Sequence, residues 1–392
     1  MKSRRLALTP LLLPALCQST GLAMPESQKY DSSYQVYQED NDRIRVESFY
    51  LRGEVELTAD TAVRFQYLND SISGSSPTGA LPGGLQPYLA EIEEVREGIM
   101  SAISHQFGDH RLEIEASRSV ESDYESIGLA LSDRWDLNQK NTTLAFGINY
   151  LSDLVAVFGL PDQDKNGLDL FGGVTQVIDK NTVITANLTI GYNWGYLNDP
   201  YKVIQRNEIV SFPDGDGGMI EIPVVNIFSE NRPDERFRQV IQLQGTHYFE
   251  PANAALDAVL RLSHDDYGVF SRSLQVEWRQ AIGDKFEVTP FVRYYHQNAA
   301  DFFANTLNDV PIANPESYPS VSGPNYSADY RLSSLDTYSL GIRLRYQFCK
   351  NFAANVSYER YAMSGSGSGS DVAPGQSYPD ADIWTFGLGL KF

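Results

Sequence analysis

Oxygen-bearing side chains alternate between residues 162 and 169 in a spacing that suits Ca²⁺ binding. The ligands would be Asp162, Asp164, Asn166 and Asp169. Gly167 would allow the sharp bend that a calcium loop needs, but the twelfth position from Asp162 is Gly173, where a helical calcium loop carries a bidentate glutamate. The motif predicts either a Ca²⁺ site in a long loop or an acidic turn, and we favour the turn. Ca²⁺ is the one cofactor that the sequence suggests.

A second group of residues has the types that nucleophilic catalysis uses, at the outer end of one expected hairpin. Its members are His264, Asp265, Asp266 and Ser271. A serine, a histidine and a carboxylate can act together only within hydrogen-bond reach, and a polar loop tip explains the same residues more simply. The sequence contains no nucleophile elbow, zinc-binding HExxH motif or phosphate loop. An enzyme is therefore the least favoured function.

The elements that carry these residues show a period of two, which is typical of β-strands with one apolar face. In the last stretch of the chain every second residue is apolar: Trp384, Phe386, Leu388, Leu390 and Phe392. Strands of soluble sandwiches alternate as well, but a chain that ends on such a strand with a terminal Phe resembles the signal read by the bacterial barrel-assembly machinery. The same alternation recurs upstream, for example over 338–348 and 184–194.

The lengths of the connections alternate between short and long. Short polar turns are expected at 58–61, 108–110, 138–141, 179–181, 250–254, 283–285 and 349–351, and long connections at 70–94, 157–167, 196–235, 297–334 and 364–380. Short turns at one end and long loops at the other are typical of outer-membrane barrels. With a first strand over 29–39 and a last over 382–392, the pattern predicts a transmembrane antiparallel up-and-down β-barrel of sixteen strands. The even number puts both termini on the periplasmic side.

Charged residues repeatedly occupy the polar face of these strands. In a membrane barrel this face is the lumen. The residues expected to line it are Arg96, Arg111, Glu113, Glu115, Arg134, Glu277, Arg279, Glu287, Arg293, Arg343, Arg345 and Glu359. A sixteen-strand barrel is wide enough for an aqueous channel that such charges could tune. Alternatively, the charges could pair across the lumen as a structural network, helped by an inward-folded loop.

The N-terminus and the net charge bear on the location of the protein. Residues 1–23 have a basic start, an apolar stretch and a small-x-small cleavage site, which predicts a signal peptide followed by a barrel over 24–392. Its removal takes the formal net charge from −20 to −23, because Lys2, Arg4 and Arg5 are lost and no acid is. Such a charge argues against nucleic-acid binding. It suits outer-membrane loops that lie among lipopolysaccharide and divalent cations.

Four segments resemble an uncharacterised family of bacterial proteins, known only as a domain of unknown function and regarded as outer-membrane barrels. The matching segments are 71–79 (SISGSSPTG), 121–124 (ESDY), 294–303 (YYHQNAADFF) and 326–331 (YSADYR). The resemblance implies a barrel in the outer membrane and no particular activity. All four segments are expected at or near the outer loops, where function usually resides.

Together these features predict a channel or transporter for small hydrophilic solutes in the outer membrane. The alternative is a non-conducting barrel whose large loops, 196–235 and 297–334, bind or assemble with partners. An outer-membrane enzyme is the third hypothesis. The expected contacts are outer-membrane lipid, lipopolysaccharide and, during biogenesis, the barrel-assembly machinery.

Overall fold

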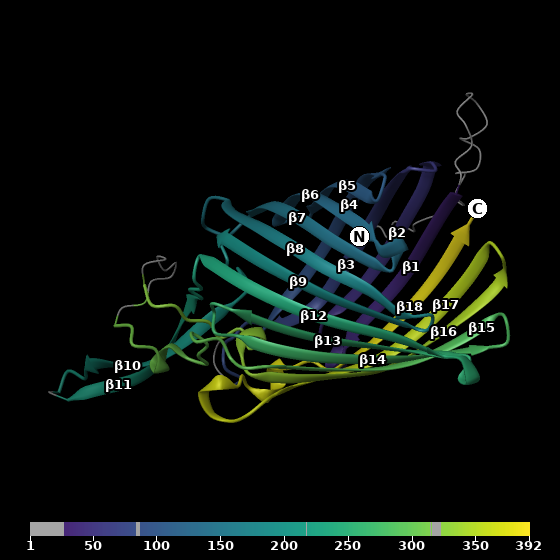
Figure 1. Ribbon diagram of the computed structural model, residues 1–392. Coiled ribbons are helices and arrows are strands. Elements are labelled where there is room, and N and C mark those ends of the chain that lie inside the picture. The colour runs from purple at the N-terminus through teal and green to yellow at the C-terminus, as the bar shows by residue number, and fades with distance from the viewer. Residues whose placement is uncertain (1–26, 84–86, 217, 314, 316–322) are drawn as a thin grey trace, which may run out of the picture.

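The computed structural model describes residues 27–83, 87–216, 218–313, 315 and 323–392. Sixteen of its strands close into one antiparallel barrel, in which β1 (Ser27–Glu39) pairs with β18 (Ala381–Lys391) (Figure 1). The fold predicted from the alternation is therefore confirmed. The expected signal peptide, residues 1–23, lies outside the described residues.

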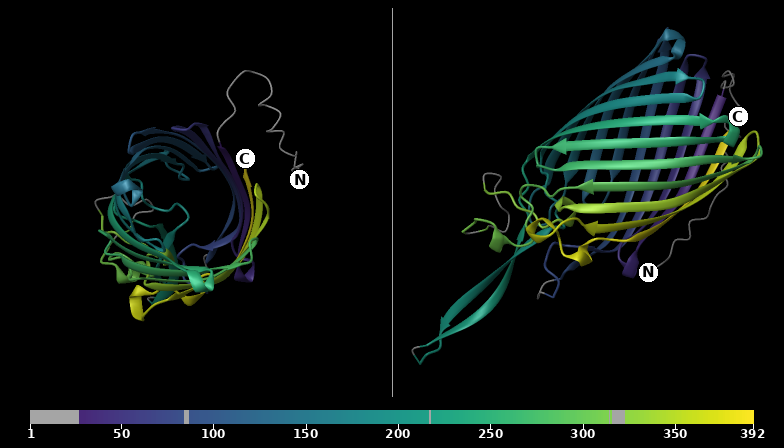
Figure 2. Two further views of the ribbon diagram at one scale, coloured as in Figure 1. Left: turned by 45° about the vertical axis from the view of Figure 1, so that its right-hand side comes forward. Right: turned by 60° about the horizontal axis from the view of Figure 1, so that its bottom comes forward.

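The strands follow one another around the barrel in chain order, except where a projecting hairpin interrupts them. The barrel strands between β1 and β18 are β2 (Arg45–Thr58), β3 (Thr61–Pro77), β4 (Leu89–Phe107), β5 (His110–Val120), β6 (Tyr124–Leu137), β7 (Thr142–Val155), β8 (Gln163–Asp179), β9 (Thr182–Gly195), β12 (Glu235–Phe249), β13 (Ala254–Asp265), β14 (Phe270–Ile282), β15 (Phe286–Gln297), β16 (Leu335–Cys349) and β17 (Phe352–Gly365). The hairpin consists of β10 (Val203–Pro213) and β11 (Met219–Ser229), and it extends well beyond the loop end of the barrel (Figure 2).

The seven expected short turns all connect neighbouring strands at one end of the barrel. Several turn residues have left-handed backbones, such as Gly108 (φ 60°) and Asn253 (φ 48°), which glycine and asparagine adopt at little cost. Phe392 exchanges backbone hydrogen bonds with Gln28, so β1 begins and β18 ends beside the short turns. The strands extend further than expected at the other end, because β3 continues to Pro77 and β8 begins at Gln163.

Short 3-10 helices lie in the connections. They are η2 (Asp40–Asp42), η3 (Asn138–Lys140), η4 (Glu250–Ala252), η5 (Leu307–Asp309), η6 (Tyr330–Leu332), η7 (Gly369–Asp371) and η8 (Gly375–Ser377). Among the described residues, no helix is long and apolar enough to cross a membrane.

The two faces of the wall differ as the alternation requires. Large apolar side chains such as Ile99, Leu340 and Leu388 are exposed on the outer face, while the residues between them face the lumen. Aromatic residues on this outer face contact one another across strands, as Tyr358 does with Trp384 and Phe249 with Trp278. This apolar exterior is stable only against lipid, because water would be in contact with most of it.

Candidate functional site

The inner wall carries all twelve charged residues that the sequence assigns to the lumen. Each lies in register with inner-face positions of the adjacent strands; Arg111 is opposite Arg134, for example, and Glu287 is opposite Arg345. Many of them line two cavities. One of about 520 Å³ is bordered by Asp31, Glu277, Arg279, Glu287, Arg343 and Arg345. The other, of about 310 Å³, is bordered by Glu54, Arg64, Arg111, Glu113 and Arg134.

Ion pairs between different strands of the inner wall join strands that are neighbours or have one strand between them. Arg64 of β3 lies 2.6 Å from Glu113 and 2.9 Å from Glu115, both on β5. Arg343 of β16 lies 3.8 Å from Glu277 of β14. Between the described barrel strands, no ion pair crosses from one side of the lumen to the other. The charges therefore line the wall and do not fill the lumen.

The loop end of the barrel is occupied by long connections that pack on one another. We call these segments the cap: 196–204 and 230–234 between β9 and β12, 266–269, 298–313 and 323–334 between β15 and β16, and 366–380. One apolar cluster joins three connections through Tyr267, Phe303, Leu332, Ala373 and Tyr378. A second contains Ile204, Ala304, Leu307, Tyr326 and Ala328. The cap thus has a core of its own, like a small soluble domain.

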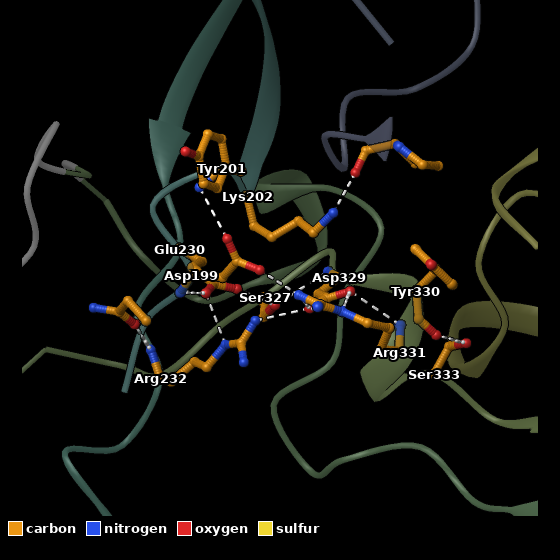
Figure 3. A network of polar contacts seen from close by, with 12 residues as sticks. Asp199, Tyr201, Lys202, Glu230, Arg232, Ser327, Asp329, Tyr330, Arg331 and Ser333 are labelled. Carbon is orange, nitrogen blue, oxygen red and sulfur yellow. Dashed lines mark hydrogen bonds and ion pairs between the residues drawn. The ribbon is translucent and has the colours of Figure 1, made fainter. Parts of the chain in front are cut away.

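A network of buried charges ties the β9–β12 and β15–β16 connections together (Figure 3). Arg232 lies 2.7 Å from Glu230 and 2.8 Å from Asp329, and the two carboxylates are each 1% exposed. The Ser327 hydroxyl donates to Glu230 (2.5 Å). Arg331 contacts Asp329 and also Asp199 of the other connection. Removing Arg232 would leave Glu230 buried without a cationic partner.

Burial and neighbouring charges shift the protonation of the two carboxyl groups in opposite directions. For Glu230, desolvation outweighs the attraction of Arg232 and raises the pKa to about 7, and the nearby Asp329 adds to the rise. Burial alone would also raise the pKa of Asp329. However, Arg331 and Arg232 hold it well below its usual range. At neutral pH Asp329 is thus charged, whereas Glu230 is close to its titration point.

The cap crosses the mouth of the barrel. Lys202, which is 4% exposed, donates from Nζ to the carbonyl of Pro77 at 2.5 Å. Pro77 ends β3, whereas Lys202 follows β9, and strands β4 to β8 lie between them in the barrel. Tyr201 donates to Asp123 of the β5–β6 connection at 2.5 Å. Contacts between such widely separated strands mean that these residues span the opening instead of lining its rim.

The calcium motif lies in a strand and not in the long loop that the spacing suggested. Residues from Gln163 on belong to β8, where Asn166 pairs with Ser152 and Trp194. Asp164 and Asp169 are five positions apart in this strand. Because successive side chains of a strand point to opposite faces, the two carboxylates lie on opposite faces of the wall. Within the described part of the chain, no group of three or more His, Cys, Asp or Glu residues is placed to hold a metal ion. Gly167 has no left-handed backbone, so the expected bend is absent.

The histidine, aspartate and serine group is also split by strand geometry. Ser271 pairs with Ser263 on the inner face, whereas His264 pairs with Phe270 on the outer face. Asp266 accepts from the backbone N–H of Phe237 (3.0 Å). The serine and the histidine therefore lie on opposite sides of the wall, and the catalytic arrangement considered above is wrong.

The buried residues of the cap, such as Glu230 and Lys202, carry no local motif, and sequence reasoning did not single them out. The four family-like segments, however, all belong to the cap or contact it. Segment 326–331 supplies Asp329 and Arg331, 294–303 supplies Phe303, 71–79 supplies Pro77, and 121–124 supplies Asp123. These four segments could have indicated the site from the sequence, since they gather at one place in the fold.

The comparisons with known proteins agree with this architecture. Residues 4–86, 82–163 and 159–378 match the model of a family described as "Protein of unknown function (DUF3570)". The chain belongs to this family. The resemblance to an uncharacterised barrel family is thereby confirmed. No curated protein matches the chain.

Solved structures of other proteins resemble the chain, among them an outer-membrane protein. The chain resembles CdiB from Acinetobacter baumannii (TM-score 0.51, 9% identity, 93% of this chain and 60% of that one). It also resembles a bacterial polysaccharide outer membrane secretin (TM-score 0.50, 9% identity, 93% and 98%). It covers 61% of the siderophore receptor PirA from Pseudomonas aeruginosa (TM-score 0.45, 12% identity, 93% of this chain). At these identities the likeness concerns the fold alone, and the protein is an outer-membrane β-barrel.

Proposed function

We propose that the protein is an outer-membrane channel for small hydrophilic solutes, with access controlled by the cap. The observation that carries this proposal is the distribution of ion pairs. Where charges of the wall form ion pairs, they do so along the wall, as Arg64 does with Glu113 and Glu115, and this leaves the interior to water and solute. Structural pairing across the lumen, which would support a solid barrel, is not what the described residues form.

In our proposal the cap supplies the control, because it crosses the end from which the long loops emerge. In our proposal this end faces the cell exterior, and the short turns and both termini face the periplasm. Opening requires the cap to separate from β3 or from the β5–β6 connection, which means breaking contacts such as Lys202 to Pro77 and Tyr201 to Asp123. The barrel hydrogen bonds need not change during this movement.

Conductance in a planar lipid bilayer tests the proposal. We expect small or infrequent conductance steps from the wild-type protein. Arg232→Met removes the cation shared by Glu230 and Asp329 and should give larger and more frequent steps. Arg118→Met is the matched control, since Arg118 lies on the outer face and pairs with Glu125. The channel hypothesis fails if both the wild type and Arg232→Met stay silent while they are folded.

The hairpin β10–β11 favours a second function, which an absence of conductance in the bilayer experiment would support. The hairpin projects from the cap and exposes the large apolar residues Ile209, Phe212, Met219, Ile220 and Ile222. A two-stranded hairpin that stands alone in water is of marginal stability, and exposed apolar patches commonly mark binding surfaces. The corresponding function is a non-conducting surface barrel that binds partners through this hairpin.

A further inference from the structure

Arginines outnumber carboxylates on the inner face of strands β12 to β16. The arginines are Arg236, Arg238, Arg261, Arg279, Arg293, Arg343 and Arg345, and the carboxylates are Asp257, Asp265, Glu277 and Glu287. They extend from the cap end of β12 to the short-turn end of β16. A solute that moves along this wall would therefore meet a guanidinium group at each level of the lumen.

Three of the four carboxylates on this wall are already engaged by other arginines. Asp257 lies 3.4 Å from Arg279. Asp265 pairs with Arg236, and Glu277 lies 3.8 Å from Arg343. Among the described residues, none of these carboxylates forms an ion pair with Arg261 or Arg293, which thus keep their positive charge without a counter-ion from the protein.

Arg261 and Arg293 are close enough to act on one small solute. Arg261 of β13 is opposite Ser273 of β14, and Arg293 of β15 is opposite Gln275, two residues further along β14. With ordinary strand spacings, their Cα atoms lie about 12 Å apart, and both side chains are long. Gln275 accepts from Nε of Arg293 at 2.8 Å, which fixes the direction of that guanidinium group.

The opposite wall offsets only part of this charge, because several of its carboxylates have cationic partners there. Asp70 lies 2.5 Å from Arg96, and Glu113 and Glu115 share Arg64. Charges on a narrow, water-filled passage with low-dielectric walls attract oppositely charged solutes strongly. Guanidinium groups, in addition, match carboxylate and phosphate oxygens with paired hydrogen bonds.

We propose that Arg261 and Arg293 form a binding site in the lumen for the carboxylate or phosphate group of a permeating solute. The proposal rests on the channel function and names its substrate class, small anionic solutes. The arginines above and below, such as Arg238 and Arg343, continue the path toward each end of the barrel. The site binds anions even though the whole chain has a formal net charge of −20, because arginines outnumber carboxylates on this wall.

Two measurements test the site: one records conductance, and the other measures anion binding and does not depend on conductance. In a bilayer under a KCl gradient, the reversal potential gives the ratio of chloride to potassium permeability. In detergent, calorimetry with citrate or with inorganic phosphate gives anion affinity directly. The test protein is a double variant that combines Arg261→Gln and Arg293→Gln. The control is Arg118→Gln, which removes a charge from the outer face. The bilayer measurement uses the wild-type and the Arg232→Met background.

We expect an anion-selective wild-type channel whose permeability ratio falls on the order of tenfold in the double variant. Citrate or phosphate affinity should fall by about tenfold or more, and Arg118→Gln should change neither. Replacing both arginines by lysine should retain selectivity but weaken binding, because the forked hydrogen bonds are lost. Stronger binding of citrate than of phosphate would identify carboxylates as the ligand class, and the reverse order would identify phosphates.

The outcomes separate the two proposals. If the protein conducts but is cation-selective, the proposed anion site is wrong and the channel function stands. The same conclusion follows if the double variant has the same selectivity as the wild type. Absence of citrate and phosphate binding overturns the site as well. Binding that depends on Arg261 and Arg293 in a protein that never conducts overturns the channel and leaves the anion site. Circular dichroism and heat-modifiable migration confirm that each variant is folded.

Discussion

The barrel wall and the cap are stabilised by different interactions, although they belong to one chain. In the wall, hydrogen bonds between adjacent strands satisfy the backbone, and large side chains such as Leu340 remain exposed for lipid to cover. The cap buries apolar residues such as Leu307 and charged ones such as Asp329 within the protein itself. Because the two regions share few kinds of interaction, the cap can loosen while the wall stays intact.

Breaking the buried charge network should have the largest effect, and it should be confined to the cap. Arg232→Met leaves Glu230 and Asp329 without their shared partner, at a cost of roughly 3–5 kcal/mol for a buried ion pair. We expect proteolytic cleavage in the connections 196–204 and 323–334, with unchanged heat-modifiable migration of the barrel. If Arg232→Met also abolished the heat-modifiable migration of the barrel, the cap and the wall would form one cooperative unit.

The wall was predictable from sequence because it follows a rule that each strand repeats. Trp384 to Phe392 alternate without interruption, and every short turn contains residues that tolerate tight backbone geometry. The register then determines which residues share a face, so Arg343 and Arg345 could be assigned to the inner face without coordinates. The same rule, applied fully, would have separated His264 from Ser271.

The cap was not predictable because no period governs it. Glu230, Lys202 and Asp329 are far apart in sequence, and their burial depends on how three connections pack together. Strands β10 and β11 lie within 196–235, which the sequence predicted as one long connection. The calcium motif was expected in a loop and lies in β8 for a related reason, because spacing alone does not distinguish a loop from a strand.

A cavity in the cap core should have the next largest effect. Leu307 is 1% exposed and packs with Ile204 and Tyr326, so Leu307→Ala should lower the stability of the cap by about 2–5 kcal/mol. Hydrogen exchange of backbone amides in 302–310 and 326–332 should become faster. Leu340→Ala is the matched control on the lipid face, where acyl chains can occupy the vacated space. Equal effects of the two substitutions would show that the cap has no core of its own.

A change of pH should have the smallest effect, and its direction follows from Glu230. The folded pKa of about 7 lies above the usual value of 4.5, so the folded cap binds a proton that the open cap releases. This contribution to stability is fully present below about pH 4.5 and is lost as the pH rises through 7. The pKa of Asp329 is lowered, so its contribution acts in the opposite direction and is lost only at acid pH well below 4.

The groups that face Glu230 determine whether the cap responds as a unit. They are Arg232, Asp329, Ser327 and the backbone N–H of Asp199, with Lys202 and Arg331 close by. We expect amides of 197–202 to exchange several-fold faster at pH 8 than at pH 5.5, after correction for intrinsic rates. Glu230→Gln, which cannot ionise, should abolish the difference, whereas amides in the middle of β16 should show none in either protein. A pH effect that survives in Glu230→Gln would assign the response to another group and would weaken the distinction between a titratable cap and an inert wall.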